Sequence, residues 1–200
     1  MRSVYNFVVT PKGDRYNNKK KIGGSELIIN TEIYNHQYVN REAVVVSTPI
    51  VGETNIKVGD TVIVHHNVFR RWHNQYGIEK NSRSYFNDNT YLINHDQIFL
   101  YKKNKKWITP KGYCFVKPLK AVNKFNTERE NPLQGIVKYS DGTVDVDDLV
   151  GFTPNSEYEF IIDNEKLYRV LSKFITIKYE YQGNEEAYNP GWAQSGWRTN

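Results

Sequence analysis

The sequence predicts an all-β protein built as a tandem duplication, and three observations carry this prediction. Runs of β-branched residues such as Val62–Val64 follow turn residues, and β-branched side chains favour strands. The turn-and-strand block Ile56–His66 has a second copy in Val144–Phe152, which aligns without a gap and matches Asp60 with Asp148. The 15 tyrosines and 4 tryptophans supply much of the apolar mass, which suits sheets more than helices.

The repeat extends to both sides of this block. Further segments recur in the same order, which predicts two domains of similar design at residues 1–110 and 111–180, followed by a tail at 181–200. The matched segments, first copy before second, are Phe7–Val8 with Phe115–Val116, Arg41–Ser47 with Gln134–Ser140, Tyr91–Ile93 with Tyr168–Val170, and Ile98–Leu100 with Ile175–Ile177.

Composition limits the class of protein. The one cysteine, Cys114, excludes an internal disulfide, so the fold must be held by packing. No apolar run is long enough to span a bilayer and no signal peptide is recognised, so we expect a cytoplasmic protein, in a host cytoplasm if the chain is viral. The formal net charge of +5 permits acidic partners without requiring them.

The first copy contains a long connection that the second copy shortens. After a first strand at Ser3–Pro11, residues 15–40 are mostly polar and read as a mobile loop, because no alternation in them predicts pairing. Within this loop, Gly23-Gly24 precedes the apolar triplet Leu27-Ile28-Ile29. The corresponding segment of the second copy, Lys120–Pro132, is charged and lacks both features.

These segments together resemble the GroES co-chaperonin family. The resemblance implies a small antiparallel β-barrel in each half, a homo-oligomeric ring, no cofactor and no catalytic residues. A closed ring that used both halves equivalently would contain an even number of barrels. The residues that carry the resemblance are Gly23-Gly24, Arg41 and Val58-Gly59-Asp60 in the first copy, and Asp148–Val150, Ile161–Glu165, Leu167–Val170 and Ile175–Ile177 in the second.

The resemblance also implies a partner, since loops of this type in the family bind the apical domains of a chaperonin. By residue matching, Leu27, Ile28 and Ile29 would be the anchors, with Gly23 and Gly24 as a flexible lead-in. Ser25-Glu26 separates the glycines from the triplet, whereas the family pattern has them adjacent. The alternative is that the triplet forms a short edge strand packed on its own barrel.

An insertion at residues 66–86 lengthens the first copy further. Its histidines, together with His65, suggest a metal site; a solvated loop at the barrel edge is the alternative, because adjacent histidines on a strand point to opposite faces. Phe69–Trp72 combines basic and aromatic residues, as nucleic-acid contacts do. Carboxylates are nearly as numerous as basic residues in the chain, which argues against nucleic acid. The histidines are His65, His66 and His73.

Catalysis finds little support, and we expect no enzyme. Cys114 has no histidine nearby and reads as a buried thiol. Asp145, Asp147 and Asp148 read as a solvated turn. The tail after Tyr179 reads as a disordered end, with packing on its own barrel or on a partner as the alternative.

Two functions therefore remain open. The first is a co-chaperonin whose N-terminal half faces the chaperonin. The second is a repurposed tandem barrel that serves as a structural or assembly protein, for example in a phage, since abundant Lys, Asn, Tyr and Ile suggest an AT-rich genome. In either case we expect Val62, Val64, Val150 and Phe152 to lie in the cores.

Overall fold

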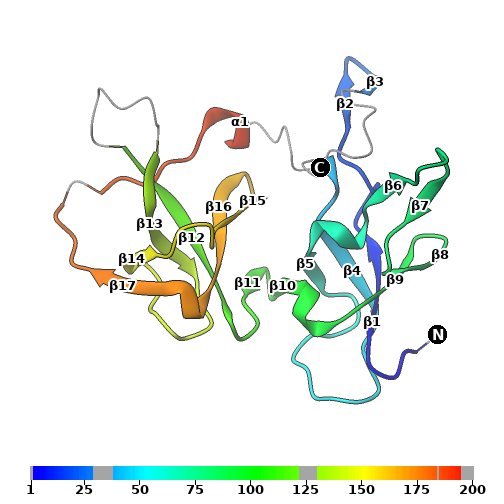
Figure 1. Ribbon diagram of the computed structural model, residues 1–200, viewed down its shortest axis with the longest axis horizontal. Helices are drawn as coiled ribbons and strands as arrows, with labels where there is room; N and C mark the ends of the chain where they lie inside the picture. The colour runs from blue at the N-terminus through cyan, green and yellow to red at the C-terminus, as the bar shows by residue number, and fades with distance from the viewer. Residues whose placement is uncertain (1, 29–37, 122–129, 184, 195–200) are drawn as a thin grey trace. The chain divides into compact units, whose positions relative to one another are not determined.

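The structure, a computed structural model, describes residues 2–28, 38–121, 130–183 and 185–194. It is an all-β structure with antiparallel sheets, as the sequence predicts. The chain divides into two compact units, Met1–Lys106 (unit 1) and Trp107–Asn200 (unit 2), each with its own sheet (Figure 1). No helix in the described residues has the length and apolar character needed to cross a membrane.

The main sheet of unit 1 has the strand order β11-β10-β5-β4-β1-β9-β8, and two further hairpins, β2–β3 and β6–β7, are separate two-stranded sheets. The elements are β1 (Phe7–Pro11), β2 (Lys19–Ile22), β3 (Ser25–Ile28), β4 (Glu42–Ser47), β5 (Thr61–Val64), the 3₁₀ helix η2 (His66–Val68), β6 (Arg71–His73), β7 (Glu79–Asn81), β8 (Tyr85–Asn87), β9 (Thr90–Ile93), η3 (His95–Gln97), β10 (Ile98–Lys103) and β11 (Lys106–Ile108).

The sheet of unit 2 has the order β15-β16-β12-β13-β14-β17. Its elements are β12 (Tyr113–Lys120), β13 (Glu130–Tyr139), β14 (Leu149–Phe152), β15 (Tyr158–Ile162), β16 (Glu165–Leu171), η4 (Ser172–Phe174), β17 (Ile175–Tyr179) and the short helix α1 (Gly191–Gln194).

The two sheets repeat one connectivity. Reading β1, β4, β5, β8, β9 and β10 as the counterparts of β12, β13, β14, β15, β16 and β17 gives the same neighbours in both units. A 3₁₀ turn precedes the last strand of each set, η3 before β10 and η4 before β17. Within the described residues both sheets are open, whereas the sequence analysis expected barrels.

The turn before β5 and β14 is the same in both units. In one, the Asp60 side chain accepts a hydrogen bond from the Lys57 backbone N–H at 2.8 Å, and in the other Asp148 accepts from Asp145 at 3.0 Å. An aspartate that binds the backbone three residues earlier closes a tight turn. The match of Asp60 with Asp148 in the sequence thus corresponds to an equivalent hydrogen bond.

The upstream part of the sequence alignment is wrong by one residue. The backbone N–H groups of Val45 and Val137 donate to the carbonyls of Asp60 and Asp148 respectively, so these two valines are equivalent. The sequence alignment had instead placed Val44 opposite Val137. Val44–Val46 is apolar at every position, so the alternation that fixes strand register was missing there. The first strands are shifted in the same way, because Val9 pairs with Tyr91 and Val116 with Tyr168.

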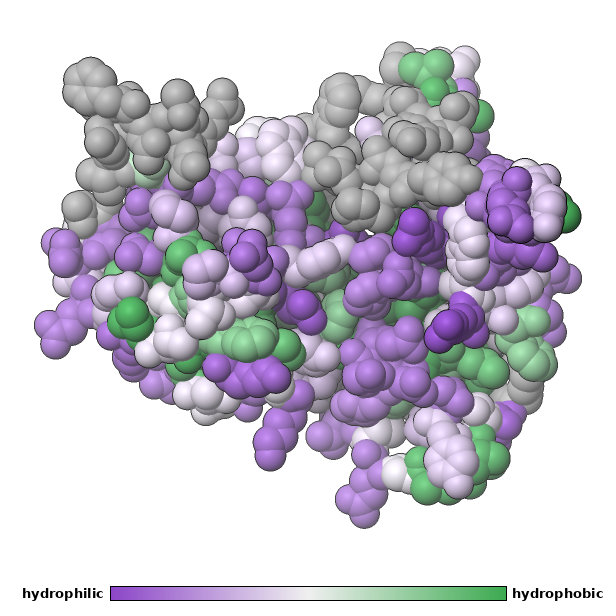
Figure 2. All heavy atoms as spheres, viewed as in Figure 1, coloured by the Kyte–Doolittle hydropathy of each residue, from purple (hydrophilic) through white to green (hydrophobic). Residues whose placement is uncertain are grey.

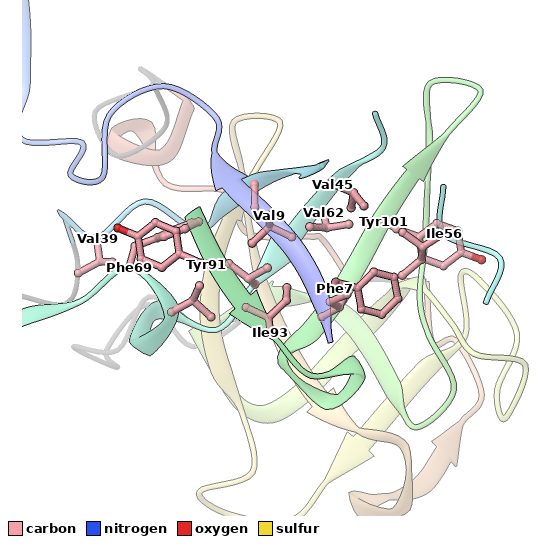
Figure 3. Close-up of a cluster of buried hydrophobic side chains, with 14 of the residues drawn as sticks. Phe7, Val9, Val39, Val45, Ile56, Val62, Phe69, Tyr91, Ile93 and Tyr101 are labelled. Atoms are coloured by element: carbon pink, nitrogen blue, oxygen red, sulfur yellow. The ribbon is translucent and has the colours of Figure 1, made fainter. Parts of the chain in front are cut away.

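Each unit has its own core. In unit 1 the buried side chains run from Ile56 and Tyr101 at one end to Val39 and Phe69 at the other (Figure 3). The Phe69 and Tyr91 rings meet edge to face at 4.7 Å between centroids. The four residues expected in the cores, Val62, Val64, Val150 and Phe152, are all buried.

The described part of the tail packs on unit 2 and is not the disordered end that the sequence suggested. Ala187 forms a β-bridge with Leu119, and the Tyr188 N–H donates to the Pro118 carbonyl at 2.8 Å. Ala193 on α1 is fully buried. Small residues of this segment fill space against β12 and β16, and the lack of alternation in the sequence concealed this packing.

Candidate partner-binding site

The connection between β1 and β4 forms a β-hairpin at residues 19–28. β2 and β3 pair from Lys19 opposite Ile28 to Ile22 opposite Ser25, which leaves Gly23 and Gly24 as a two-residue turn. Both glycines have positive φ, 54° and 88°, as a type I′ turn requires. The expectation that nothing in this segment pairs is therefore wrong. The strands pair because the Gly-Gly turn brings them together, although apolar and polar residues do not alternate in either strand.

The hairpin exposes the apolar residues that the sequence singled out. The side chain of Leu27 is 54% exposed and that of Ile28 is 56% exposed. Among the described strands, β3 pairs with β2 alone, so Leu27 and Ile28 do not form an edge strand of the main sheet. Ile29 lies outside the described residues. Figure 2 shows hydrophobic surface over this hairpin, above a largely hydrophilic body.

A hydrogen-bonded clamp holds the two ends of the connection together. The side-chain amide of the buried Asn40 donates to the carbonyls of Lys12 at 3.0 Å and Asp14 at 2.8 Å. Its side-chain oxygen accepts from the Glu42 N–H at 2.8 Å. Asn40 thus uses both ends of its amide to fix where the chain leaves β1 and enters β4, so the hairpin starts from a defined base.

Arg15 extends this base into the insertion. Its guanidinium donates to the Phe69 carbonyl at 3.1 Å and to the Asn81 side-chain oxygen at 2.9 Å. The same group lies over the rings of Tyr85 and Tyr91, at 5.7 and 5.4 Å from their centroids. Burial lowers the pKa of Arg15 from its usual value, but a guanidinium remains charged at any pH of interest.

The hairpin surface is also charged. Lys19 Nζ lies 3.1 Å from the Asp14 carboxylate and 3.5 Å from that of Glu26. The hydrogen bond to Asp14, followed by the charge of that same carboxylate, raises the pKa of Lys19. These exposed pairs contribute little to stability, because water and salt screen the attraction between exposed charges.

Sequence reasoning missed Arg15, Tyr16 and Asn40. These residues flank the loop, and in the sequence they look like ordinary polar or aromatic loop residues. One signal was present: Asn40 stands immediately before the first residue of a strand pattern, where a side-chain amide can bond the neighbouring backbone. Its two long-range partners, Lys12 and Asp14, could not be inferred without the fold.

The other candidate residues have structural roles. His65 caps η2 through its Nδ1, which accepts from the Asn67 N–H, and its ring stacks on His66 at 4.3 Å. Across the described residues, no three His, Cys, Asp or Glu side chains are grouped so that they could hold a metal ion. Cys114 is buried, with its Sγ 3.5 Å from the Ser172 hydroxyl. Asp148 pairs with Lys178 at 2.8 Å.

The aromatic and basic residues of the insertion are largely occupied within unit 1. Phe69 is in the core, and the Arg71 guanidinium lies 5.0 Å from the centroid of the Tyr16 ring. Arg71 also forms an ion pair with Glu79 at 3.1 Å. Phe69 is therefore not available to stack on a base, and Arg71 is already paired with a carboxylate. The segment Phe69–Trp72 thus offers little to a nucleic acid.

A cavity of about 470 Å³ in unit 2 is a second concave feature. Its wall includes the buried Lys166, which donates to Glu130 at 2.6 Å and lies 3.2 Å from Glu159. The Tyr168 hydroxyl donates to the other Glu130 oxygen at 2.7 Å. Burial is the largest single influence on Lys166 and lowers its pKa, but hydrogen bonding to Glu130 and Tyr168 and the charge of Glu159 together outweigh it and raise the pKa. The charges of Glu130, Glu159 and Lys166 satisfy one another, whereas Oε2 of Glu157, which also lines the cavity, is buried without a hydrogen-bond partner among the described residues.

Comparison with models of known protein families finds no match, and comparison with characterised proteins finds none either. The assignment of function therefore depends on the geometry and on the sequence resemblance alone.

Proposed function

We propose that the protein is a co-chaperonin-like protein that binds a chaperonin through the β2–β3 hairpin and so caps or modulates it during protein folding. The hairpin carries this proposal: it is clamped at its base and presents two adjacent aliphatic side chains, Leu27 and Ile28, to solvent. A short apolar segment on a fixed base can enter a groove on a partner while the rest of the unit stays unchanged.

The proposal includes the architecture of each unit. The repeated strand order is consistent with two divergent GroES-type barrels, in which the hairpin of unit 1 occupies the position of the family's loop. In the sequence, the corresponding connection of unit 2 lacks the Gly pair and the apolar triplet. Unit 1 would therefore face the chaperonin, and the two units would have different roles.

Energetics support an assembly with several copies. Burying one Leu or Ile side chain completely gains about 1.5–3 kcal/mol, and these two are already about half buried. Ordering the hairpin opposes this gain, so one hairpin binds weakly. Several hairpins on one ring would bind tightly through their high effective concentration. We therefore include a homo-oligomeric ring in the proposal.

The test is to mix the purified protein with a double-ring chaperonin and nucleotide and to measure co-elution by size-exclusion chromatography with light scattering. The double variant Leu27→Ser/Ile28→Ser should lose co-elution while keeping the oligomer mass. Ile50→Ser/Val51→Ser is the matched control, because these side chains are exposed to a similar extent, 55% and 53%. The control should bind like the unchanged protein.

Deleting residues 23–29 should have the same effect as the double variant. If the intact protein does not bind a chaperonin, the proposal fails and the structural or assembly role takes its place. If the Leu27→Ser/Ile28→Ser variant binds normally, the hairpin is not the contact, even if a chaperonin is the partner.

A further inference from the structure

The net positive charge of the chain lies in two segments, which contain few carboxylates. The connection at residues 15–40 and the insertion at 66–86 contain eight Lys and Arg against three Glu, an excess of five positive charges. The formal net charge of the whole protein is +5, so the charges of all other residues cancel. Both segments belong to unit 1, and their hairpins β2–β3 and β6–β7 extend from one end of it (Figure 1).

The insertion presents a second hairpin, β6–β7, with an apolar tip. Asn74 organises its turn, because the Asn74 side-chain oxygen accepts from the N–H groups of Tyr76 at 3.0 Å and Ile78 at 2.9 Å. Gly77 supplies the positive φ of 72° that closes the turn. The Tyr76 side chain is 76% exposed and that of Ile78 is 55% exposed. A built turn thus holds two large apolar side chains in solvent.

The two hairpins share one base. The Tyr16 hydroxyl accepts from the backbone N–H of Arg71 at 2.9 Å, which joins the start of the first segment to β6. Arg15 bonds Asn81 at the end of β7 and the carbonyl just before β6. The second hairpin is therefore fixed to the residues that carry the first one, through side chains on both sides.

We propose that β6–β7 is a second contact for the partner that binds β2–β3, and that this partner presents an apolar groove bordered by carboxylates. This inference rests on the proposed function and adds the second contact and the charge of the binding surface. Lys80 and Arg83 are exposed, and neither forms an ion pair within the described part of the chain. Their positive charges are available to acidic groups on a partner.

A protein partner fits this surface better than a nucleic acid does. The exposed apolar residues of the two hairpins are Leu27, Ile28, Tyr76 and Ile78; three of the four are aliphatic, and aliphatic side chains offer no stacking surface to a base. The guanidiniums of Arg15 and Arg71 are engaged with groups of unit 1. These mostly aliphatic side chains and the exposed positive charges of Lys80 and Arg83 together match an apolar groove with an acidic border.

The experiment measures the dissociation constant for an immobilised double-ring chaperonin with nucleotide, over a series of salt concentrations. Tyr76→Ser/Ile78→Ser should weaken binding by about tenfold or more. Its matched control is Tyr5→Ser/Ile50→Ser, with exposed fractions of 72% and 55%, near the opposite end of β1. All four side chains are exposed, so thermal unfolding should be unchanged in both variants.

Charge reversal tests the acidic border separately. Lys80→Glu/Arg83→Glu should weaken binding at low salt and flatten its salt dependence, because attraction between exposed charges is screened by ions. Lys57→Glu/Lys103→Glu changes the net charge by the same amount on exposed side chains outside both segments and should leave the salt dependence unchanged.

The outcomes separate this inference from the proposed function. If the unchanged protein binds, and the Tyr76/Ile78 and Lys80/Arg83 variants bind equally well, the second contact is wrong and the co-chaperonin function stands. If both charge-reversal variants weaken binding alike, the attraction is general and the localised acidic border is wrong. Binding of the unchanged protein to single-stranded nucleic acid but not to chaperonin would overturn both proposals.

Discussion

The guanidinium of Arg15 donates to the carbonyl oxygen of Phe69, across 54 residues of sequence. This bond joins the start of the β1–β4 connection to the insertion, and it places a charged group over the Tyr91 ring in the core. The long connection and the insertion, which the sequence presents as two separate irregular segments, are one structural assembly at the end of unit 1.

Replacing Arg15 with Ala should destabilise unit 1 by about 2–3 kcal/mol, because hydrogen bonds from charged groups contribute about 1.5–3 kcal/mol and the Phe69 carbonyl would lose its partner. Urea unfolding followed by tryptophan and tyrosine fluorescence measures this change. Arg83→Ala, at an exposed position, is the control and should change stability by less than about 0.5 kcal/mol. If both variants change the free energy of unfolding equally, Arg15 does not stabilise the contact between the β1–β4 connection and the insertion.

Replacing Phe152 with Ala should destabilise unit 2 by about 3–5 kcal/mol, because the side chain is buried against Val116, Val137 and Val150. The measurement is again the free energy of unfolding. Phe86→Ala, at a half-exposed position in unit 1, serves as the control for removal of a phenyl ring. A loss below about 1 kcal/mol at Phe152 would mean that its place in β14 is wrong.

Amide hydrogens of Gly23–Ile28 should exchange quickly in the free protein. An isolated two-stranded hairpin is at best marginally stable in water, and β2–β3 pairs with no other described strand. Hydrogen exchange measured by mass spectrometry should show far stronger protection in β1 and β9, which lie inside the main sheet. Protection of the hairpin equal to that of β9 would mean that it packs on a surface of its own protein.

Stability should fall as the pH rises from about 10 to 12. Burial raises the pKa of Tyr91, Tyr139 and Tyr168 to about 12, whereas an exposed tyrosine titrates near 10. Between these values the folded chain keeps protons that the unfolded chain releases, so alkali favours unfolding. The loss is at most about 1.4 kcal/mol per pH unit for each tyrosine, measurable by denaturation over a series of pH values.

Tyr91→Phe provides the control for this pH dependence. This variant should lose less free energy of unfolding between about pH 10 and 12, because Tyr91 no longer titrates. At neutral pH its free energy of unfolding should be unchanged or higher, because the buried Tyr91 hydroxyl has no hydrogen-bond partner among the residues that the structure describes. An unpaired buried hydroxyl costs about 1–3 kcal/mol. A neutral destabilisation above about 1 kcal/mol would mean that the hydroxyl is hydrogen-bonded in solution.

The sequence predicted the fold class and the apolar residues of the hairpin, because both depend on local patterns. β-branched runs after turn residues marked strands, and the Asp60 and Asp148 turns fixed the alignment next to them. Register failed at Val44–Val46, where every position is apolar and a one-residue shift changes no pattern. The clamp at Asn40 also escaped prediction, because its hydrogen bonds reach residues 26 and 28 positions away.

The hairpin itself escaped prediction for a different reason. All four residues of β3 are exposed, so this strand has no alternation of buried and exposed positions that hydrophobic periodicity could reveal. The turn alone specifies the pairing, and a Gly-Gly pair is a weaker hairpin signal than Asn-Gly. The exposure of Leu27 and Ile28 then follows from the position of the hairpin outside the main sheet.

The Gly23-Gly24 turn gives a means of changing how long a partner stays bound. No atom of the described residues lies within 4 Å of where a Cβ would lie on either glycine, so these residues leave room for a side chain and only the positive φ angles disfavour one. Asn tolerates positive φ, and Gly23→Asn would reduce the conformations open to the unbound hairpin. We expect such a hairpin to dissociate more slowly. Under the proposed chaperonin binding, the native Gly pair would then favour rapid release, as repeated cycles of binding require.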